Sequence, residues 1–296
     1  MILILSEEQD QSTDDVIDWL IYYKKKFIRI NYEDFVTRIY MDKSNINLCF
    51  ENKILDFDAI NSFWNRRGLI NYEKLKKIGN TNDVQKRHLI DEWKIIDNYI
   101  HFKLCKKKGI INPKENINKL IVLDVAQAVG LLTPDFFIAD KRQKTFEQTV
   151  IKTIGESFDL YKGNFNYSLY TEDLPSIEYD DFFATFFQEK ITPVYEVRAI
   201  FLLNKCWAMT IHNPTTETDY RKNYDNVRYS PYTLPVKIQD KVFKLMKILN
   251  LKYGAVDFIV DKDNNHYFLE INPFGQFGMV SIPCNYNIEE YIAKIL

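Results

Sequence analysis

Three oxygen-bearing side chains near the end of the chain indicate a chemistry. Asp257 follows the apolar run 254–256, and Glu270 and Asn272 belong to a second apolar run after the polar turn 263–265. Alternate residues of a strand point to one face, so Glu270 and Asn272 share a face, and antiparallel pairing can bring Asp257 beside them. Mg²⁺ binds a few carboxylates together with substrate phosphates. The pattern therefore predicts a site for Mg²⁺ and ATP.

The cations that would face the phosphates must lie outside the usual glycine-rich loops, because the chain has neither GxxxxGK[ST] nor GxGxxG. Lys152 is a lone cation in the apolar run 150–154. It either points into a cleft and binds phosphate or serves as an edge lysine that discourages aggregation. Lys119, at the front of a helix, is a second candidate, and an ordinary exposed lysine is the alternative.

Two further segments suit the other parts of a nucleotide. The run 186–191 changes from aromatic to charged and back, which is typical of an adenine slot or of a solvent-facing strand end. Its candidate adenine-binding residues are Gln188, Glu189, Lys190 and Ile191. Glu196 and Arg198 alternate with apolar residues. They form either a simple ion pair on one face or, in a cleft, hold ribose and an acyl phosphate respectively.

An acidic segment precedes the proposed adenine strand. Residues 171–181 place acids beside apolar residues, which fits an exposed loop with a helix cap or a docking surface for a basic peptide helix. The docking interpretation rests on Glu172, Asp173, Glu178, Asp180 and Asp181.

Composition excludes several other classes of function. A net charge of -2 provides no broad attraction for nucleic acid, and the short basic runs 24–26 and 106–108 read as solvated helix ends. The four cysteines lack CxxC spacing, which argues against a zinc site or a disulfide framework and favours a reducing cytoplasm. No apolar run reaches the roughly 20 residues of a membrane span, so we expect a soluble, unexported protein. His212 and His266 lack metal-ligand spacing and are expected to be structural.

The first hundred residues alternate between strands and helices. Strands are predicted at 2–5 and 27–30, with a capped helix start at 12–15, which is the opening of a β-α-β unit. A hairpin is predicted from 46–50 and 53–57, and a further strand leads to residues 62–67. The spacing from 84 to 108 predicts a helix whose apolar stripe is Leu89, Trp93, Ile96, Ile100 and Leu104.

A boundary is predicted at 109–113, where a turn follows this helix. A helix over 118–129 should end at Gly130, followed by strands at 136–139 and 149–154 and a mobile loop at 155–166. Next come an apolar segment at 183–191, a hairpin of 195–203 with 206–212, a helix over 236–249 and the candidate metal hairpin. These elements predict an α+β protein with lobes 1–110, 111–190 and 191–296 around a nucleotide cleft.

Taken in order along the chain, these segments resemble the ATP-grasp ligases over most of its length. The supporting series is Asn118-Lys119, Gly130-Leu131, Pro134, Ile151-Lys152, Gln188-Glu189-Lys190, Glu196-Val197-Arg198, Asp219-Tyr220-Arg221, Asp257 and Glu270-Ile271-Asn272. Within that superfamily the run 270–277 and the Asp-Tyr-Arg element resemble the peptide-modifying branch. That branch includes the microviridin-type macrocyclases and the "grasp-with-spasm" peptide maturases of Bacteroidetes, which form omega-esters.

This resemblance implies an ATP-grasp fold, in which an N-terminal α/β lobe precedes two α+β lobes that enclose the nucleotide. It implies that ATP activates Asp or Glu side chains of a precursor peptide as acyl phosphates, which a Ser or Thr hydroxyl or a Lys amine then attacks. It also implies a leader helix at the acidic segment, ordering of loop 155–168 over the phosphates and a homodimer.

The resemblance further implies a role for each candidate residue. Lys119 and Lys152 hold phosphates, residues 189–191 receive adenine, and Glu196 takes ribose. Mg²⁺ lies on Asp257, Glu270 and Asn272. Arg198 and Arg221 stabilise the acyl phosphate and the tetrahedral intermediate.

Two alternatives remain at this point. A RimK-like ligase that adds free amino acids to a protein or a small acid would share the ATP and Mg²⁺ residues and differ in its acceptor. A non-catalytic nucleotide-binding or peptide-binding module is the other, although such a module should lack one of the three metal residues.

Overall fold

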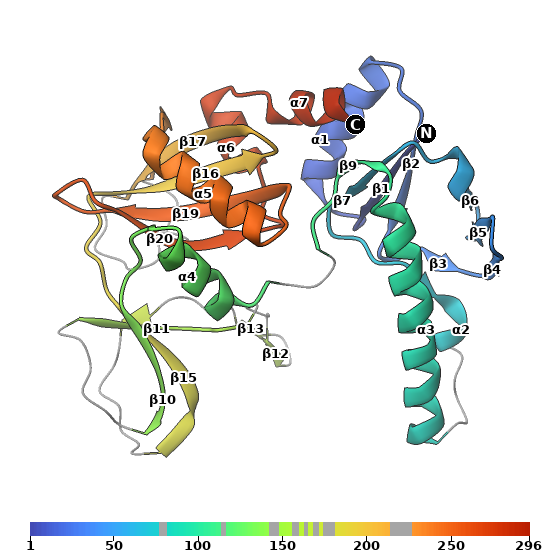
Figure 1. Cartoon of the computed structure of the whole chain (residues 1–296), viewed down its shortest axis with the longest axis horizontal. Helices are drawn as coiled ribbons and strands as arrows, with labels where there is room; N and C mark the ends of the chain where they lie inside the picture. The colour runs from blue at the N-terminus through green and yellow to red at the C-terminus, as the bar shows by residue number, and fades with distance from the viewer. Residues whose placement is uncertain are drawn as a thin grey trace. The chain divides into compact units, whose positions relative to one another are not determined.

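A computed structural model describes the chain except for residues 77–81, 114–116, 142–147, 156–159, 163–164, 168–171, 174–180 and 214–226. By their contacts the residues form two compact units (Figure 1). Unit 1 contains Met1–Glu115, Gln276–Ser281 and Asn287–Leu296, and unit 2 contains Asn116–Gly275 and Ile282–Tyr286. Most of the last twenty residues thus group with the beginning of the chain. The separation of residues 111–190 from 191–296 stays a prediction.

Unit 1 is built on a parallel sheet with strand order β2-β1-β7-β9. The strands are β1 (Ile2–Ser6), β2 (Phe27–Asn31), β7 (Ser62–Asn65) and β9 (Lys108–Ile110). Helix α1 (Gln11–Tyr22) links β1 to β2, which confirms the predicted β-α-β opening. The helix begins one residue before the predicted Ser12, because Asp10 is the N-cap and accepts the Ser12 N–H.

A small antiparallel sheet lies between β2 and β7 in the chain. It contains β4 (Arg38–Met41), β5 (Ile46–Cys49) and β6 (Ile54–Asp56), followed by the short helix η1 (Phe57–Ala59). The pairing of β5 with β6 confirms the predicted hairpin. Strands β3 (Phe35–Val36) and β8 (Asn71–Tyr72) form a separate parallel pair.

Three further helices lie wholly in the part of unit 1 that the structure describes. They are α2 (Glu73–Lys76), α3 (Asp83–Leu104) and α7 (Ile288–Ile295), which packs against α1. In α3 the residues Trp93, Ile100 and Leu104 are buried as predicted, whereas Leu89 is 42% exposed and does not belong to the core stripe. The stripe prediction fails there because burial of this helix begins only at Trp93.

The first sheet of unit 2 has the order β10-β15-β11-β14, with antiparallel neighbours. Its strands are β10 (Phe136–Lys141), β15 (Asp181–Glu189), β11 (Thr149–Lys152) and β14 (Glu172–Asp173). A two-stranded ribbon pairs β12 (Leu160–Lys162) with β13 (Phe165–Tyr167). The predicted loop at 155–166 is therefore wrong at these residues, and the dipeptide Gly163-Asn164 between two apolar-rich triplets was the missed hairpin signal.

The second sheet of unit 2 has the order β18-β17-β16-β19-β20 and is antiparallel throughout. Its strands are β16 (Tyr195–Leu202), β17 (Lys205–His212), β18 (Arg228–Tyr232), β19 (Tyr253–Val260) and β20 (His266–Asn272). Helices α4 (Lys119–Ala128) and α5 (Val236–Ile248) share one core with this sheet (Figure 1). Of strand β16, residues 197, 199 and 201 face that core. Residues 196, 198 and 200 consequently point to the opposite face.

Local signals explain the ends of α4. Asn118 is its N-cap and accepts the N–H groups of Leu120 and Ile121. Gly130 adopts a φ of +81° just beyond the last turn, a conformation that glycine tolerates better than other residues. The predicted helix over 118–129 with its glycine end is confirmed. Helix α6 (Gly278–Cys284) follows the second sheet.

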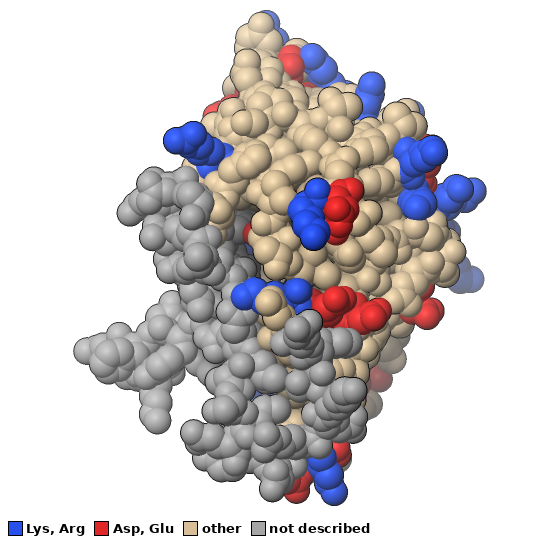
Figure 2. Space-filling model, turned by 90° about the vertical axis from the view of Figure 1, so that its left-hand side faces the viewer, with Lys and Arg blue, Asp and Glu red and all other residues tan. Residues whose placement is uncertain are grey.

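Charges of both signs are interspersed over the described part of the face in Figure 2, without a broad patch of one sign. This distribution agrees with the net charge of -2. Among the helices of the described ranges, none has both the length and the apolarity that crossing a membrane requires.

Candidate active site

The second sheet of unit 2 places three charged residues in one row. Arg198 of β16 is paired with Asp257 of β19, and Asp257 is paired with Glu270 of β20. Asn272 lies two residues beyond Glu270 and is paired with Ala255. Because strand side chains alternate, these residues lie on one face, opposite the face that α4 and α5 cover. Antiparallel register brings Asp257 beside the other two oxygen donors.

Arg198 and Asp257 form a close ion pair. The Nη1 atom of Arg198 lies 3.0 Å from Oδ1 and 2.9 Å from Oδ2 of Asp257. The two side chains are 15% and 24% exposed, so water screens the pair only partly. The arginine thus directly neutralises one carboxylate of the row.

Glu270 is surrounded by cations from other elements. The Nζ atom of Lys119, in the first turn of α4, lies 3.4 Å from its Oε2. Loss of hydration raises the pKa of Glu270, but Lys119, then Lys152 and Arg198, outweigh that effect and hold the pKa below its usual value. This electrostatic influence indicates that Lys152 of β11 lies near the row. Strand β11 lies between β15 and β14, but β14 pairs only with Val150 and Ile151, so the choice between the phosphate-binding and edge-lysine interpretations of Lys152 stays a prediction.

A tight turn orients Asn272. The N–H of Phe274 donates to Oδ1 of Asn272 at 2.8 Å, and the N–H of Gly275 donates to its backbone oxygen at 3.2 Å. The run Asn272-Pro273-Phe274-Gly275 has the residues that β-turns favour at their first, second and fourth positions. Because an amide oxygen has two lone pairs, Oδ1 retains one for a further ligand.

The donor set of this face suits a magnesium ion that is also held by phosphates. Two carboxylates and one amide oxygen are hard ligands. Within the described ranges, no three His, Cys, Asp or Glu residues gather as a metal cluster, so protein carboxylates alone do not make a complete cage. The carboxylates are already balanced by Arg198 and Lys119. An ion with its own anionic ligand fits this arrangement better than a bare ion.

The residues predicted to receive the nucleoside lie at the end of β15 and on β16. Gln188 is 1% exposed, the Glu189 N–H donates to the oxygen of Asp135, and the Lys190 N–H donates to the oxygen of Gln148. Ile191 follows the strand. Glu196 shares the outward face of β16 with Arg198. The structure therefore places these residues in unit 2, while their individual roles stay predictions.

Several predicted residues lie outside the described ranges. Arg221, Glu178 and Asp180 are among them. Glu172 and Asp173 form the short strand β14, whose backbone pairs with β11. Asp181 begins β15 as an exposed residue opposite Lys141.

Sequence reasoning missed two residues beside the row. The hydroxyl of Tyr253 donates to the backbone oxygen of Gly275 at 2.5 Å, and the bond is buried. A Cβ atom on Gly275 would lie only 2.4 Å from the Cβ of Ala255 and 3.3 Å from Nη2 of Arg198. The turn motif after Asn272 was the available signal for Gly275. No local sequence signal pointed to Tyr253, because its hydrogen-bond partner Gly275 lies 22 residues away in the sequence.

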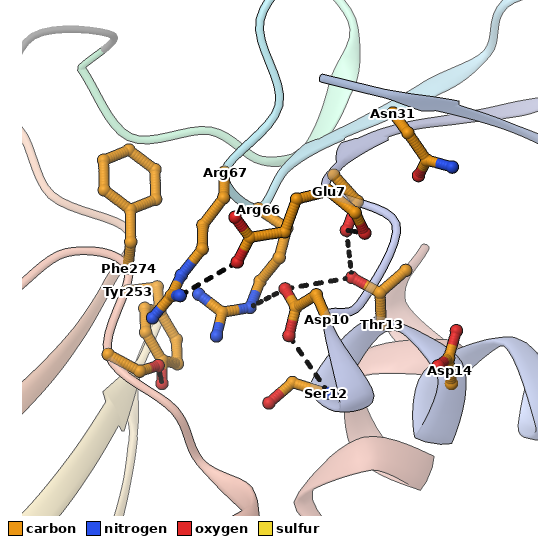
Figure 3. A network of polar contacts seen from close by, with 12 residues as sticks. Glu7, Asp10, Ser12, Thr13, Asp14, Asn31, Arg66, Arg67, Tyr253 and Phe274 are labelled. Carbon is orange, nitrogen blue, oxygen red and sulfur yellow. Dashed lines mark hydrogen bonds and ion pairs between the residues drawn. The ribbon is translucent and has the colours of Figure 1, made fainter. Parts of the chain in front are cut away.

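A second polar network lies in unit 1 (Figure 3). Arg66, which follows β7, pairs through Nε with Oδ2 of Asp10 at 3.0 Å, and both side chains are almost completely buried. Arg67 pairs with Glu7 at 3.0 Å. Arg66 and Arg67 thus each have an anionic partner, and the ion pair between Arg66 and Asp10 connects the start of α1 to the end of β7. This network is therefore explained by its structural role.

Solved structures of peptide-modifying enzymes are similar to the whole chain. Macrocyclase MdnC from Microcystis aeruginosa MRC, bound to precursor peptide MdnA, gives a TM-score of 0.77 at 23% identity, covering 100% of this chain and 99% of that one. A RiPP-associated ATP-grasp ligase from Chryseobacterium gregarium, in complex with ADP and a leader and core peptide, gives 0.76 at 20% identity, covering 100% and 96%. The ATP-grasp ligase PsnB, complexed with minimal precursor, Mg and ADP, gives 0.73 at 15% identity, covering 99% and 95%.

The sequence matches no protein-family model and no curated protein. The structural similarities nevertheless extend over the full length of the chain, so it has the ATP-grasp fold. The predicted fold and the predicted resemblance are thereby confirmed. A fold does not by itself imply an activity, which depends on the residues of the site.

Proposed function

We propose that this chain, with its ATP-grasp fold, is an ATP-dependent macrocyclase of a ribosomally made precursor peptide. Its substrates are Asp or Glu side chains, which it joins to Thr or Ser hydroxyls or to Lys amines of the same peptide. The observation that carries the proposal is the row of Arg198, Asp257 and Glu270, with Lys119 beside it, on one face of the second sheet. The full-length similarity to a macrocyclase and to a RiPP-associated ATP-grasp ligase, each solved with a peptide, supports this choice among ligases.

Each residue of the row has a distinct task in the proposed reaction. Asp257, Glu270 and Oδ1 of Asn272 would hold Mg²⁺, which neutralises charge on the phosphates of ATP. Lys119 and Lys152 are the cations for the terminal phosphates, and Arg198 faces the group that is transferred. Residues 188–191 and Glu196 would bind the adenosine, and Arg221 is a second candidate for the acyl phosphate.

The proposed reaction has two steps. A carboxylate oxygen of the peptide attacks the terminal phosphorus of ATP, which forms an acyl phosphate and releases ADP. A hydroxyl or amine of the same peptide then attacks the acyl carbon, phosphate leaves, and the nucleophile loses its proton. The protein contributes position and charge stabilisation, and none of its side chains forms a covalent bond to the substrate.

The start of β15, in the first sheet of unit 2, is the proposed docking place for the leader of the precursor peptide. Phe183 of β15 is 91% exposed and lies two residues from the exposed Asp181. An apolar ring beside an acid suits an amphipathic peptide that carries apolar and basic residues. The docking set Glu172, Asp173, Glu178, Asp180 and Asp181 stays part of this proposal, as do a cytoplasmic location and a homodimer.

Intact mass tests the proposal directly. The protein is incubated with Mg²⁺, ATP and the Thr-rich and acid-rich peptide encoded nearest its gene, and ADP is measured in parallel. We expect the peptide to lose one water for each ring, with one ADP for each water. A gain of amino-acid residues would favour the free-amino-acid ligase, and bound ATP without any product would leave only a binding module.

A substitution at Glu270 tests whether this carboxylate is needed for the reaction and not for the fold. Glu270→Gln should retain the folded structure and lose ring formation, because the neutral amide is a much weaker ligand of Mg²⁺. Circular dichroism verifies the fold, and intact mass reports the product. Undiminished turnover of Glu270→Gln would reject the assigned metal site.

A further inference from the structure

We infer that Tyr253 is a positioning residue, which seats the turn 272–275 so that Asn272 and Arg198 are held for the Mg²⁺-nucleotide complex. The inference rests on the proposed function. Tyr253 touches neither substrate nor metal in this scheme, and it acts through the backbone of Gly275.

A buried hydrogen bond joins Tyr253 to the turn. Tyr253 is 6% exposed, and its hydroxyl donates to the Gly275 oxygen at 2.5 Å inside the protein. A buried carbonyl that loses its donor keeps the cost of its lost hydration. The bond therefore fixes where the end of the turn lies relative to strand β19. Figure 3 shows Tyr253 and Phe274, the residue before Gly275.

Gly275 packs closely on the row. The Cβ atom that any other residue would place there lies 2.4 Å from the Cβ of Ala255, 3.3 Å from Nη2 of Arg198 and 3.4 Å from the Cβ of Asn272. The Cα of Gly275 thus fits between the strand, the guanidinium and the amide. A shift of the turn moves the packing surface of Arg198.

Hydrogen bonds connect the turn to the metal ligand. Two backbone N–H groups of the turn, those of Phe274 and Gly275, donate to Asn272, one to Oδ1 and one to the backbone oxygen. The position of the Asn272 side-chain oxygen therefore depends on the position of the turn. The hydrogen bond from Tyr253 to Gly275 therefore acts on both the amide ligand and the arginine.

The decisive variant is Tyr253→Phe, measured by ADP binding with Mg²⁺ and with EDTA in titration calorimetry. It keeps the ring and removes only the hydroxyl. We expect Mg²⁺-dependent ADP affinity to fall by roughly tenfold, as expected for the loss of a buried hydrogen bond, while affinity in EDTA changes little. The ring-forming rate should fall with an unchanged KM for the peptide.

The matched control is Tyr286→Phe in the same unit. The Tyr286 hydroxyl also donates to a backbone carbonyl, that of Ala208, at 2.7 Å, and it accepts the Tyr232 N–H at 3.3 Å. The Ala208 side chain belongs to the opposite face of the sheet, which packs on α4 and α5. Both variants lose a tyrosine hydroxyl, so thermal unfolding compares their stability. Only Tyr253→Phe should change the ratio of ADP affinities with and without Mg²⁺. Equal ratios in the two variants and the unaltered protein would overturn the inference.

A second pair of variants tests the packing step. Gly275→Ala should weaken Mg²⁺-dependent ADP binding, because its new Cβ overlaps that of Ala255. Adding Ala255→Gly removes the overlapping atom and should restore most of the affinity. Failure of this rescue in a folded double variant would contradict the packing argument.

The same assay distinguishes the inference from the proposed function. If the unaltered protein bound ADP equally well with Mg²⁺ and with EDTA, the metal site and this inference would both fall. If the unaltered protein shows the Mg²⁺ effect and Tyr253→Phe retains it in full, the proposed function stands and only the role of Tyr253 is overturned.

Discussion

At the scale of single residues, the site is organised by charges that neutralise one another before any ligand arrives. Arg198 holds Asp257 at 2.9 Å, and Lys119 holds Glu270 at 3.4 Å. Phosphates that draw the cations away would free the carboxylates for Mg²⁺. Under the proposed function these residues would link metal binding to nucleotide binding, and such linkage is reciprocal.

This pairing predicts weak binding of Mg²⁺ alone. In titration calorimetry, Mg²⁺ should bind at least roughly tenfold more weakly without ADP than with it, a coupling of ordinary size for linked sites. Arg198→Met should strengthen binding of Mg²⁺ alone, because Asp257 loses its cation, while it impairs ring formation. Arg228→Met, at an exposed position of β18, is the control. Equal Mg²⁺ affinity with and without ADP would contradict the prediction.

The lowered pKa of Glu270 predicts a pH dependence of stability. A carboxyl group whose pKa is lower in the folded state stabilises the protein above its unfolded pKa of about 4.3, and this contribution disappears as pH falls through the folded value. The side chain is 47% exposed, so screening by water makes the effect small. Urea unfolding from pH 7 to pH 3 should show the advantage over Glu270→Gln shrinking only below the unfolded pKa.

At the scale of elements, helix α4 carries Lys119 to the row and depends on its two ends. Asn118 caps the first turn, and Gly130 ends the helix with a φ of +81°. The Nζ atom of Lys241 from α5 donates to the Gly130 oxygen at 2.5 Å, which joins the two helices that share the core. The position of Lys119 is therefore a consequence of how α4 is terminated and packed.

Gly130→Ala tests how much the left-handed backbone conformation at the C-terminal end of α4 contributes to stability. The new Cβ would lie 3.6 Å from the Lys241 side chain, an ordinary contact, so the cost comes from the left-handed conformation. We expect a loss of about 1 kcal/mol in the free energy of unfolding, measured with urea. Gly155→Ala, where nothing lies within 4 Å, is the control and should be nearly neutral. Equal stability of the two variants would argue against a strained helix end.

At the scale of the whole molecule, the last residues complete unit 1. Helix α7 packs against α1, Tyr23 donates to Glu290 at 2.5 Å, and Lys25 donates to the Ala293 oxygen at 2.9 Å. The chain thus starts in unit 1, forms unit 2 and returns to unit 1 at Gln276, apart from residues 282–286, which again group with unit 2. The stability of unit 1 should depend on residues that lie more than 260 positions from α1 in the sequence.

Ile292→Ala tests that dependence. Ile292 is 1% exposed in α7, so its truncation leaves a cavity and should cost about 2–4 kcal/mol in the free energy of unfolding. Ile282→Ala removes the same atoms from a residue that is 70% exposed and should change stability by less than about 0.5 kcal/mol. If the two variants unfold at the same urea concentration, α7 does not support the fold.

Much of the architecture follows from local sequence. Strand alternation predicted that Glu270 and Asn272 share a face, and Asn118 and Gly130 marked the ends of α4. The hairpins β5-β6, β16-β17 and β19-β20 form between neighbouring runs, as predicted. Such features depend on residues close in the sequence, where capping, turn chemistry and side-chain period act. The ordered series of motifs then predicted the ATP-grasp fold.

Only the tertiary structure decided which distant residues meet. The pairing of Arg198 with Asp257 joins strands whose residues are 59 positions apart, and Lys119 reaches Glu270 from a helix that begins in another part of unit 2. The return of α7 to unit 1 and the contact of Tyr253 with Gly275 likewise carry no local signal. The sequence determined the elements and the donor types, because those follow from neighbours along the chain. The structure decided the charge pairing of the site, because strand register and helix packing bring distant segments together.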